Sequence, residues 1–133
     1  MANAVYPKWK EGLTQASANT ALTGTVKAAL VDTGTYTYSS AHQFWSSASS
    51  AVVGTPQTIG TKTYTNGLFD GADVTYTALT GATAEAIIIY IDTGSAATSP
   101  LVAYFDTGVT NLPVTPNGGD VTITWNASGI LQL

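Results

Sequence analysis

The chain has 133 residues, of which only 9% are charged and 44% are apolar. Four lysines, no arginine and eight acidic residues give a formal net charge of −4. Nucleic-acid binding needs a basic patch that displaces counterions from phosphates, so we expect none here. Cysteine is absent, which excludes disulfides, thiolate catalysis and cysteine-bound zinc.

Length and composition predict a single β domain that covers residues 1–133. Threonine is the most frequent residue, so neutral hydroxyl groups must cover much of the surface. Surfaces with little charge repel one another weakly, which favours a protein that packs against a partner. The N-terminus lacks the segments of a signal peptide, and the longest strongly apolar run, 84–91, is too short to span a bilayer. We therefore expect a soluble protein made in a cytoplasm, without membrane association.

A short N-terminal helix is predicted over about residues 7–16. Pro7 suits the first position of a helix, and Tyr6, Trp9 and Leu13 recur at spacings that bring them to one side of a helical turn. Packing of Tyr6 and Trp9 on a sheet is the favoured interpretation, and a partner-facing arm is the alternative. Serines followed by spaced apolar residues over 39–48 suggest a second short helix.

The rest of the chain has the pattern of an antiparallel β protein. Alternation from Gly24 predicts a half-buried strand, and 86–91 is apolar on both faces, which predicts a central strand with 101–105 as its hairpin partner. Segments 58–65 and 73–79 are expected to be two antiparallel strands with an irregular connection, and the Asn-Gly and Asp-Gly pairs between them are hairpin signals. Six to eight strands, including 120–125 and a short terminal segment, indicate a β-sandwich of jelly-roll type or a small barrel.

An apolar stretch runs into Asp-Thr-Gly three times, at Asp32, Asp92 and Asp106. In an aspartic protease two such carboxylates share one proton. Asp92 and Asp106 should end consecutive antiparallel strands, roughly 17–20 Å apart at opposite ends of a sheet. Strand-ending turns, in which the Asp side chain binds a backbone amide, are the favoured interpretation. A dimeric aspartic protease that uses Asp32 is a remote alternative.

Other polar residues do not form a catalytic or metal-binding pattern. His42 is the only histidine, and its spacing supports no catalytic triad. Asp70 and Asp73 could bind calcium, but they lack the spacing of an EF-hand loop, so loop capping is favoured. We expect no catalytic residues, no metal and no cofactor.

Aromatic residues are the best candidates for contact with a partner. Core packing is their favoured role, partner contact is the second, and stacking of sugars on these rings or on Trp125 is the third. The six candidates for partner contact are Tyr6, Trp9, Tyr36, Tyr38, Phe44 and Trp45.

The sequence resembles a family of small virion proteins of tailed bacteriophages and prophages, along nearly its whole length. Four segments carry the resemblance: Met1–Glu11, Gly24–Tyr38, Asn66–Thr75 and Leu112–Asp120. Among small β-rich phage proteins, capsid decoration (cement) proteins are the closest functional match.

The resemblance implies a non-enzymatic protein that is made in the host cell cytoplasm and located on the capsid surface of a virion. Decoration proteins bind the outer face of the shell formed by the major capsid protein and stabilise it, often as trimers, so self-association is expected. The resemblance supplies no catalytic residues. A tail, fibre or baseplate-associated module that binds host surface carbohydrate is the alternative from another class.

Overall fold

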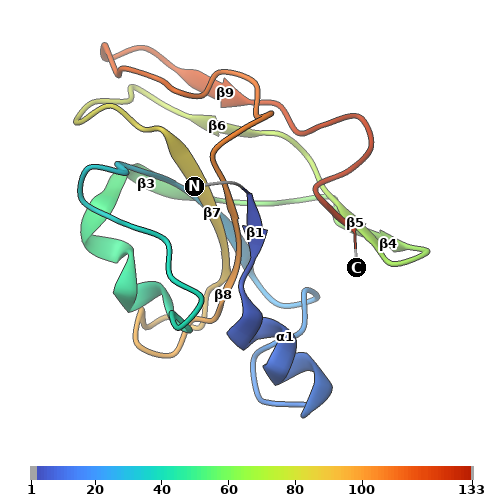
Figure 1. The fold of residues 1–133 in the computed structure, drawn as a ribbon. Coiled ribbons are helices and arrows are strands. Elements are labelled where there is room, and N and C mark those ends of the chain that lie inside the picture. The colour runs from blue at the N-terminus through green and yellow to red at the C-terminus, as the bar shows by residue number, and fades with distance from the viewer. Residues whose placement is uncertain (1–2, 133) are drawn as a thin grey trace.

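The computed structural model describes residues 3–132. As predicted, the protein is mainly β, with antiparallel sheets and one helix near the N-terminus (Figure 1). The elements are β1 (Ala4–Val5), α1 (Pro7–Thr14), β2 (Val26–Val31), β3 (Val52–Thr58), β4 (Thr63–Thr65), β5 (Leu68–Asp70), β6 (Val74–Tyr76), β7 (Ala86–Ile91), β8 (Leu101–Phe105), β9 (Val121–Ile123) and β10 (Leu131–Gln132), with 3-10 turns at Trp45–Ser47 and Ser49–Ala51.

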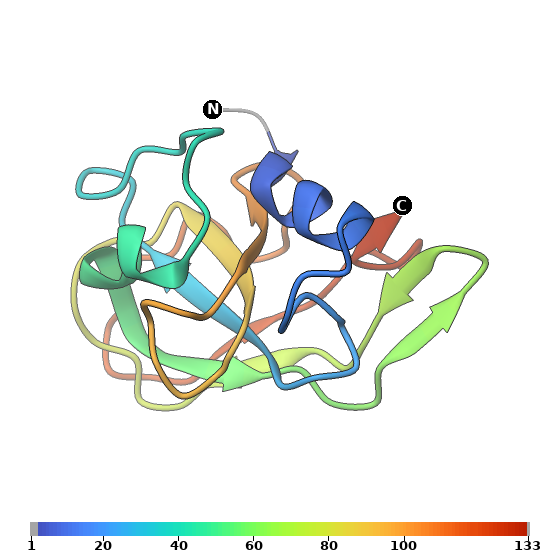
Figure 2. The ribbon, with the colours of Figure 1, turned by 90° about the horizontal axis from the view of Figure 1, so that it is seen from below.

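The strands form three antiparallel sheets. The largest has the order β1-β8-β7-β2-β3, a second has the order β10-β5-β4, and β6 and β9 form a two-stranded ribbon. The ribbon lies beside β3, and the β4–β5 hairpin projects from the body of the molecule (Figures 1 and 2). Figure 1 shows the ribbon at the top of the view and the two 3-10 turns at the lower left.

Strand β7 is central, as its uninterrupted apolar sequence predicts. It pairs with β2 on one side and β8 on the other, and all of its residues are buried. The ring of Tyr90 stacks on Trp45 at a centroid distance of 4.4 Å. Tyr76 packs in from the ribbon and donates a 2.6 Å hydrogen bond from its hydroxyl to the carbonyl of Ala28. Both faces of β7 are therefore covered by protein, which explains why the strand has no polar face.

The predicted N-terminal helix is confirmed, with Pro7 at its start and Thr14 at its end. Tyr6 and Trp9 are fully buried, so the interpretation that they pack the helix on the sheet is confirmed. The Trp9 indole N–H donates to the carbonyl of Thr20 and ties the helix to the loop that follows. Leu13 is 38% exposed, however, and Trp9 is the buried residue of the helix, so the last turn does not share the packing of the first.

The second helix expected over 39–48 is replaced by an irregular segment and two 3-10 turns. The backbone amides of Trp45 and Ser46 donate to the carbonyls of Ser99 and Ala96. An α-helix would need these amides for its own i to i−4 bonds. Hydrogen bonding with the loop after β7 therefore prevents a regular helix.

The expected strand over 58–65 is wrong in its boundaries. Strand β3 begins at Val52 and ends at Thr58, and the chain then turns at Thr61, whose φ of 50° is left-handed. Pro56 lies within β3, which is an edge strand of its sheet and therefore tolerates a residue without an N–H. The strand predicted at 73–79 is shorter and pairs with β9 rather than with the preceding strands.

The Asn66-Gly67 hairpin signal is confirmed. Both residues have positive φ, 55° and 76°, and they join β4 to β5 as a two-residue turn. Such a turn matches the twist of the strands that it connects. The predicted terminal segment pairs with β5 through Leu131 and Gln132; Leu133 lies outside the described residues.

Candidate functional site

Most of the aromatic residues that were candidates for partner contact lie in the core. Tyr6, Trp9, Tyr36 and Trp45 are buried, whereas Tyr38 and Phe44 are partly exposed. This arrangement agrees with the core-packing interpretation. Only the exposed edges of Tyr38 and Phe44 can reach a partner without rearrangement of the fold.

A chain of hydrogen bonds connects two of these tyrosines, Tyr6 and Tyr36, to His42, the only histidine. The hydroxyls of Tyr6 and Tyr36 are 2.7 Å apart, and the Tyr36 hydroxyl lies 2.9 Å from Nδ1 of His42. The rings of Tyr38 and Tyr104 pack around this chain. Burial is the main cause that raises the pKa of both Tyr6 and Tyr36. The phenols therefore stay protonated near neutral pH.

Trp45 is not available as a stacking platform for a sugar. Its ring is nearly parallel to that of Tyr90, with 5° between their planes. Only 7% of Trp45 is exposed, so the second face is covered as well. Phe44 forms an isolated β-bridge with Pro100, which fixes this segment against the loop before β8.

Two of the three Asp-Thr-Gly segments form the turns predicted for them. Oδ1 of Asp32 accepts a 2.8 Å hydrogen bond from the amide of Gly34. Oδ1 of Asp92 accepts the corresponding bond from Gly94 at 2.9 Å. Each carboxylate thus closes its own turn at the end of a strand, as the residue type and spacing predict.

The third segment is held from another part of the chain. The side-chain carbonyl of Asn3 accepts hydrogen bonds from the amides of Asp106 and Thr107, and its Nδ2 donates to the carbonyl of Thr107. This arrangement fixes the end of β8 to the residue before β1.

The sheet register keeps the three aspartates apart. Strands β7 and β8 are antiparallel, so Asp92 and Asp106 lie at opposite ends of the sheet, as predicted. Asp32 and Asp106 lie at the same end, with β7 between them. Two strand spacings separate them by about 10 Å, which is too far for two carboxylates to share a proton.

The carboxylates of Asp70 and Asp73 each bind a backbone amide, in agreement with loop capping. Asp70 accepts from Gly71, and Asp73 accepts from the amide of Trp125. Within residues 3–132, no group of three or more histidine or acidic side chains is placed to hold a metal ion. In the same range, no helix is both long and apolar enough to cross a bilayer.

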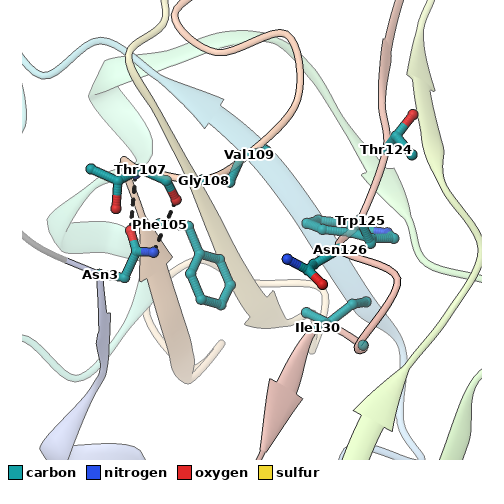
Figure 3. Close-up of a pocket in the computed structure, with 10 residues that line it drawn as sticks. Asn3, Phe105, Thr107, Gly108, Val109, Thr124, Trp125, Asn126 and Ile130 are labelled. Atoms are coloured by element: carbon teal, nitrogen blue, oxygen red, sulfur yellow. Dashed lines mark hydrogen bonds between the residues drawn. The ribbon is translucent and has the colours of Figure 1, made fainter.

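A pocket of about 270 Å³ lies between the end of β8 and the segment that follows β9 (Figure 3). We call it the Phe105–Trp125 pocket. Figure 3 shows these two rings on opposite sides, with the amide of Asn126 between them. The lining residues are Asn3, Phe105, Thr107, Gly108, Val109, Thr124, Trp125, Asn126, Gly129 and Ile130.

Hydrogen bonds fix the walls of the pocket. The backbone amide of Trp125 donates to Asp73, and its indole N–H donates to the carbonyl of Ala72, so the ring cannot rotate freely. Oδ1 of Asn126 accepts from the amide of Ser128. Asn3 holds the opposite wall through its bonds to Asp106 and Thr107. The pocket is therefore preformed, which is usual for small-molecule sites.

Sequence reasoning identified Trp125 as a possible platform but missed Phe105 and Asn126. Phe105 begins one of the Asp-Thr-Gly segments and looks like an ordinary strand residue. Only the pairing of β8 with β1, and the capping bond from Asp73 across 52 residues, place these side chains together. The aromatic residue before Asp106 was the one local signal that distinguished this segment from the other two.

Comparisons with protein-family models and with curated proteins give no match to this chain.

Proposed function

We propose that this protein is a non-enzymatic structural protein of a tailed-phage virion, a decoration protein that binds the outer face of the major capsid protein shell and stabilises it. The proposal starts from the family resemblance of four segments of the sequence. The observation that supports it in the structure is an exposed β surface that carries hydroxyl groups in place of charges.

The outer face of the β6–β9 ribbon presents this surface most clearly. Thr75 and Thr122 are exposed within the two strands, next to buried residues, and Thr77 and Thr124 are exposed directly after the strands end. The hydroxyls of Thr75 and Thr122 lie 3.0 Å apart across the ribbon. A neutral face of this kind can form hydrogen bonds with a partner without the cost of desolvating ions.

Most of the lysines are engaged within the chain. Lys8 forms an ion pair with Glu11, and Lys27 forms one with Asp92, each at 2.9 Å. The ammonium group of Lys62 donates to the carbonyls of Leu22 and Gly24. Association through this surface therefore depends on neutral hydrogen bonds and packing, and repeated copies on a symmetric shell supply avidity.

Co-sedimentation with shells of the major capsid protein, from the phage or prophage that encodes the chain, tests the proposal. Binding should persist at about 0.5 M salt, because screening weakens ion pairs and affects neutral contacts little. Thr122→Lys should weaken binding at least tenfold, because it places a charge in the neutral ribbon face. Thr23→Lys is the matched control, since Thr23 is also exposed but lies outside the ribbon.

Electron microscopy of labelled particles gives the location. Label around the capsid is the expected result, whereas label confined to the tail would replace the proposal with the tail or baseplate alternative. Loss of wild-type binding at high salt would also contradict the neutral mode of association. Light scattering of the purified protein tests the expected self-association and distinguishes a monomer from a trimer.

A further inference from the structure

The Phe105–Trp125 pocket combines apolar walls with polar groups that bear no charge. None of its ten lining residues is acidic or basic. Burying an ionic ligand there would leave its charge unpaired, at a large cost in free energy. The lining therefore favours a neutral ligand.

One polar group in the lining is oriented for a ligand. Oδ1 of Asn126 is engaged by the amide of Ser128 at 2.8 Å, which fixes the orientation of the side-chain amide. Its Nδ2 then points toward Phe105, into the pocket (Figure 3). A purely apolar ligand would leave this donor unsatisfied, so the occupant should carry an acceptor.

The two aromatic rings set the shape of the occupant. The indole N–H of Trp125 is bound to the carbonyl of Ala72, so the ring offers only its carbon framework to the pocket. Phe105 forms the facing wall. A ligand between them needs an apolar face, while a polar edge reaches the amide of Asn126.

From this combination we propose that the pocket binds a single ring of a neutral sugar. A pyranose has apolar C–H faces and a rim of uncharged hydroxyls, which matches both parts of the lining. The volume of about 270 Å³ equals that of about nine water molecules at roughly 30 Å³ each. It accommodates one ring. This inference does not depend on the capsid-binding function.

Titration of the full chain with neutral methyl glycosides, followed by amide NMR, tests the proposal. Methyl glucoside, methyl galactoside, methyl mannoside and N-acetylglucosamine are suitable probes at millimolar concentration. We expect at least one of them to shift amide signals of the pocket residues selectively. Glucuronate and cyclohexanol serve as an anionic and a mainly apolar probe, and both should bind more weakly.

Asn126→Asp separates recognition from folding. The aspartate keeps the oxygen that accepts from Ser128, so the turn persists, but it removes the Nδ2 donor. The affinity for the sugar should fall about fivefold or more, the effect of one lost hydrogen bond. Asn117→Asp is the matched control, because Oδ1 of Asn117 accepts from the amide of Gly119 in the same type of turn outside the pocket.

Three results would overturn the inference. The first is that no neutral sugar shifts the pocket amides. The second is equal sugar affinity in Asn126→Asp and Asn117→Asp. The third is that glucuronate or cyclohexanol binds as tightly as the best sugar, which would show that the uncharged polar groups do not select the ligand. Capsid co-sedimentation of Asn126→Asp should match that of the wild type, so failure of this inference is distinguishable from failure of the proposed function.

Discussion

The hydroxyls of Tyr6 and Tyr36 meet at 2.7 Å although thirty residues separate them in the chain. Tyr6 precedes α1, and Tyr36 lies in the loop after β2, so this bond joins the start of the helix to that loop. The Tyr36 hydroxyl also contacts His42. One phenol therefore links two other polar groups in a region from which water is largely excluded.

Tyr36→Phe should destabilise the protein by about 1–3 kcal/mol, because it leaves the buried hydroxyl of Tyr6 without its partner. Tyr6→Phe should cost less, since Tyr36 retains its contact with His42. Urea unfolding measures both effects. Tyr64→Phe is the control: Tyr64 is 47% exposed and donates to the carbonyl of Leu22, so its loss should cost at most about 0.5 kcal/mol. Equal losses in all three variants would contradict a special role for the buried pair.

Stability should fall steeply above about pH 10, the usual pKa of tyrosine. Burial raises the pKa of Tyr90 and of Tyr104 to about 12, and nearby Asp92 and Asp106 add to these shifts. Burial also raises the pKa of Tyr6, Tyr36 and Tyr76.

The direction of this pH dependence follows from proton binding by the folded and the unfolded protein. A raised folded-state pKa gives stability that is fully present below the unfolded value and is lost as pH rises through the folded value. Phenolate absorbance and circular dichroism, recorded in one alkaline titration, should therefore show ionisation of the buried tyrosines together with unfolding. Ionisation of most tyrosines near pH 10 in a protein that stays folded would contradict this expectation.

Local patterns were sufficient to predict those elements whose cause is local. Pro7 began a helix, Asn66-Gly67 formed a hairpin, and 86–91 became the central strand. The helix expected at 39–48 does not form, because the backbone amides of Trp45 and Ser46 donate to carbonyls of the loop after β7. No pattern in the segment itself reveals such partners.

The candidate site depends still more on distant residues. The pocket needs Asn3, Phe105 and Asn126, which come together only when β1 pairs with β8 and when Asp73 caps the backbone at Trp125. Register and long-range capping bonds are properties of the folded chain. Composition predicted the character of the surface, since a chain with few charges must expose hydroxyls, but it did not predict where a concave site would form.

Asp92→Asn should reduce stability at neutral pH by about 0.5–1 kcal/mol, because it removes a partly exposed ion pair with Lys27. The amide of Gly94 and then the ammonium of Lys27 lower the pKa of Asp92. This lowered pKa gives stability that is present above the unfolded value of about 3.9 and is lost as pH falls through the folded value. The difference between variant and wild type should therefore shrink in acid.

Asp32→Asn is the matched control for that measurement. Asp32 closes the same type of Asp-Thr-Gly turn, which an asparagine oxygen also closes, but it forms no ion pair with a lysine among the described residues. Its substitution should change stability by less than about 0.5 kcal/mol at neutral pH. Thermal unfolding between about pH 2.5 and 7 compares the two variants. A pH-independent loss in Asp92→Asn would mean that the ion pair is not its cause.

Gly54→Ala should destabilise the protein by about 1–3 kcal/mol, and Gly60→Ala should leave its stability within about 0.5 kcal/mol. Gly54 has a φ of 74°, which is unfavourable for alanine, and an added Cβ would lie 2.4 Å from Cδ1 of the buried Leu79. Gly60 has no heavy atom within 4 Å of its added Cβ and no left-handed φ. Urea unfolding of both variants measures the difference. Because Gly54 lies in β3 where the ribbon approaches, a large loss only at Gly54 would show that the left-handed φ and the close approach of Leu79 require glycine there, and equal losses would contradict it.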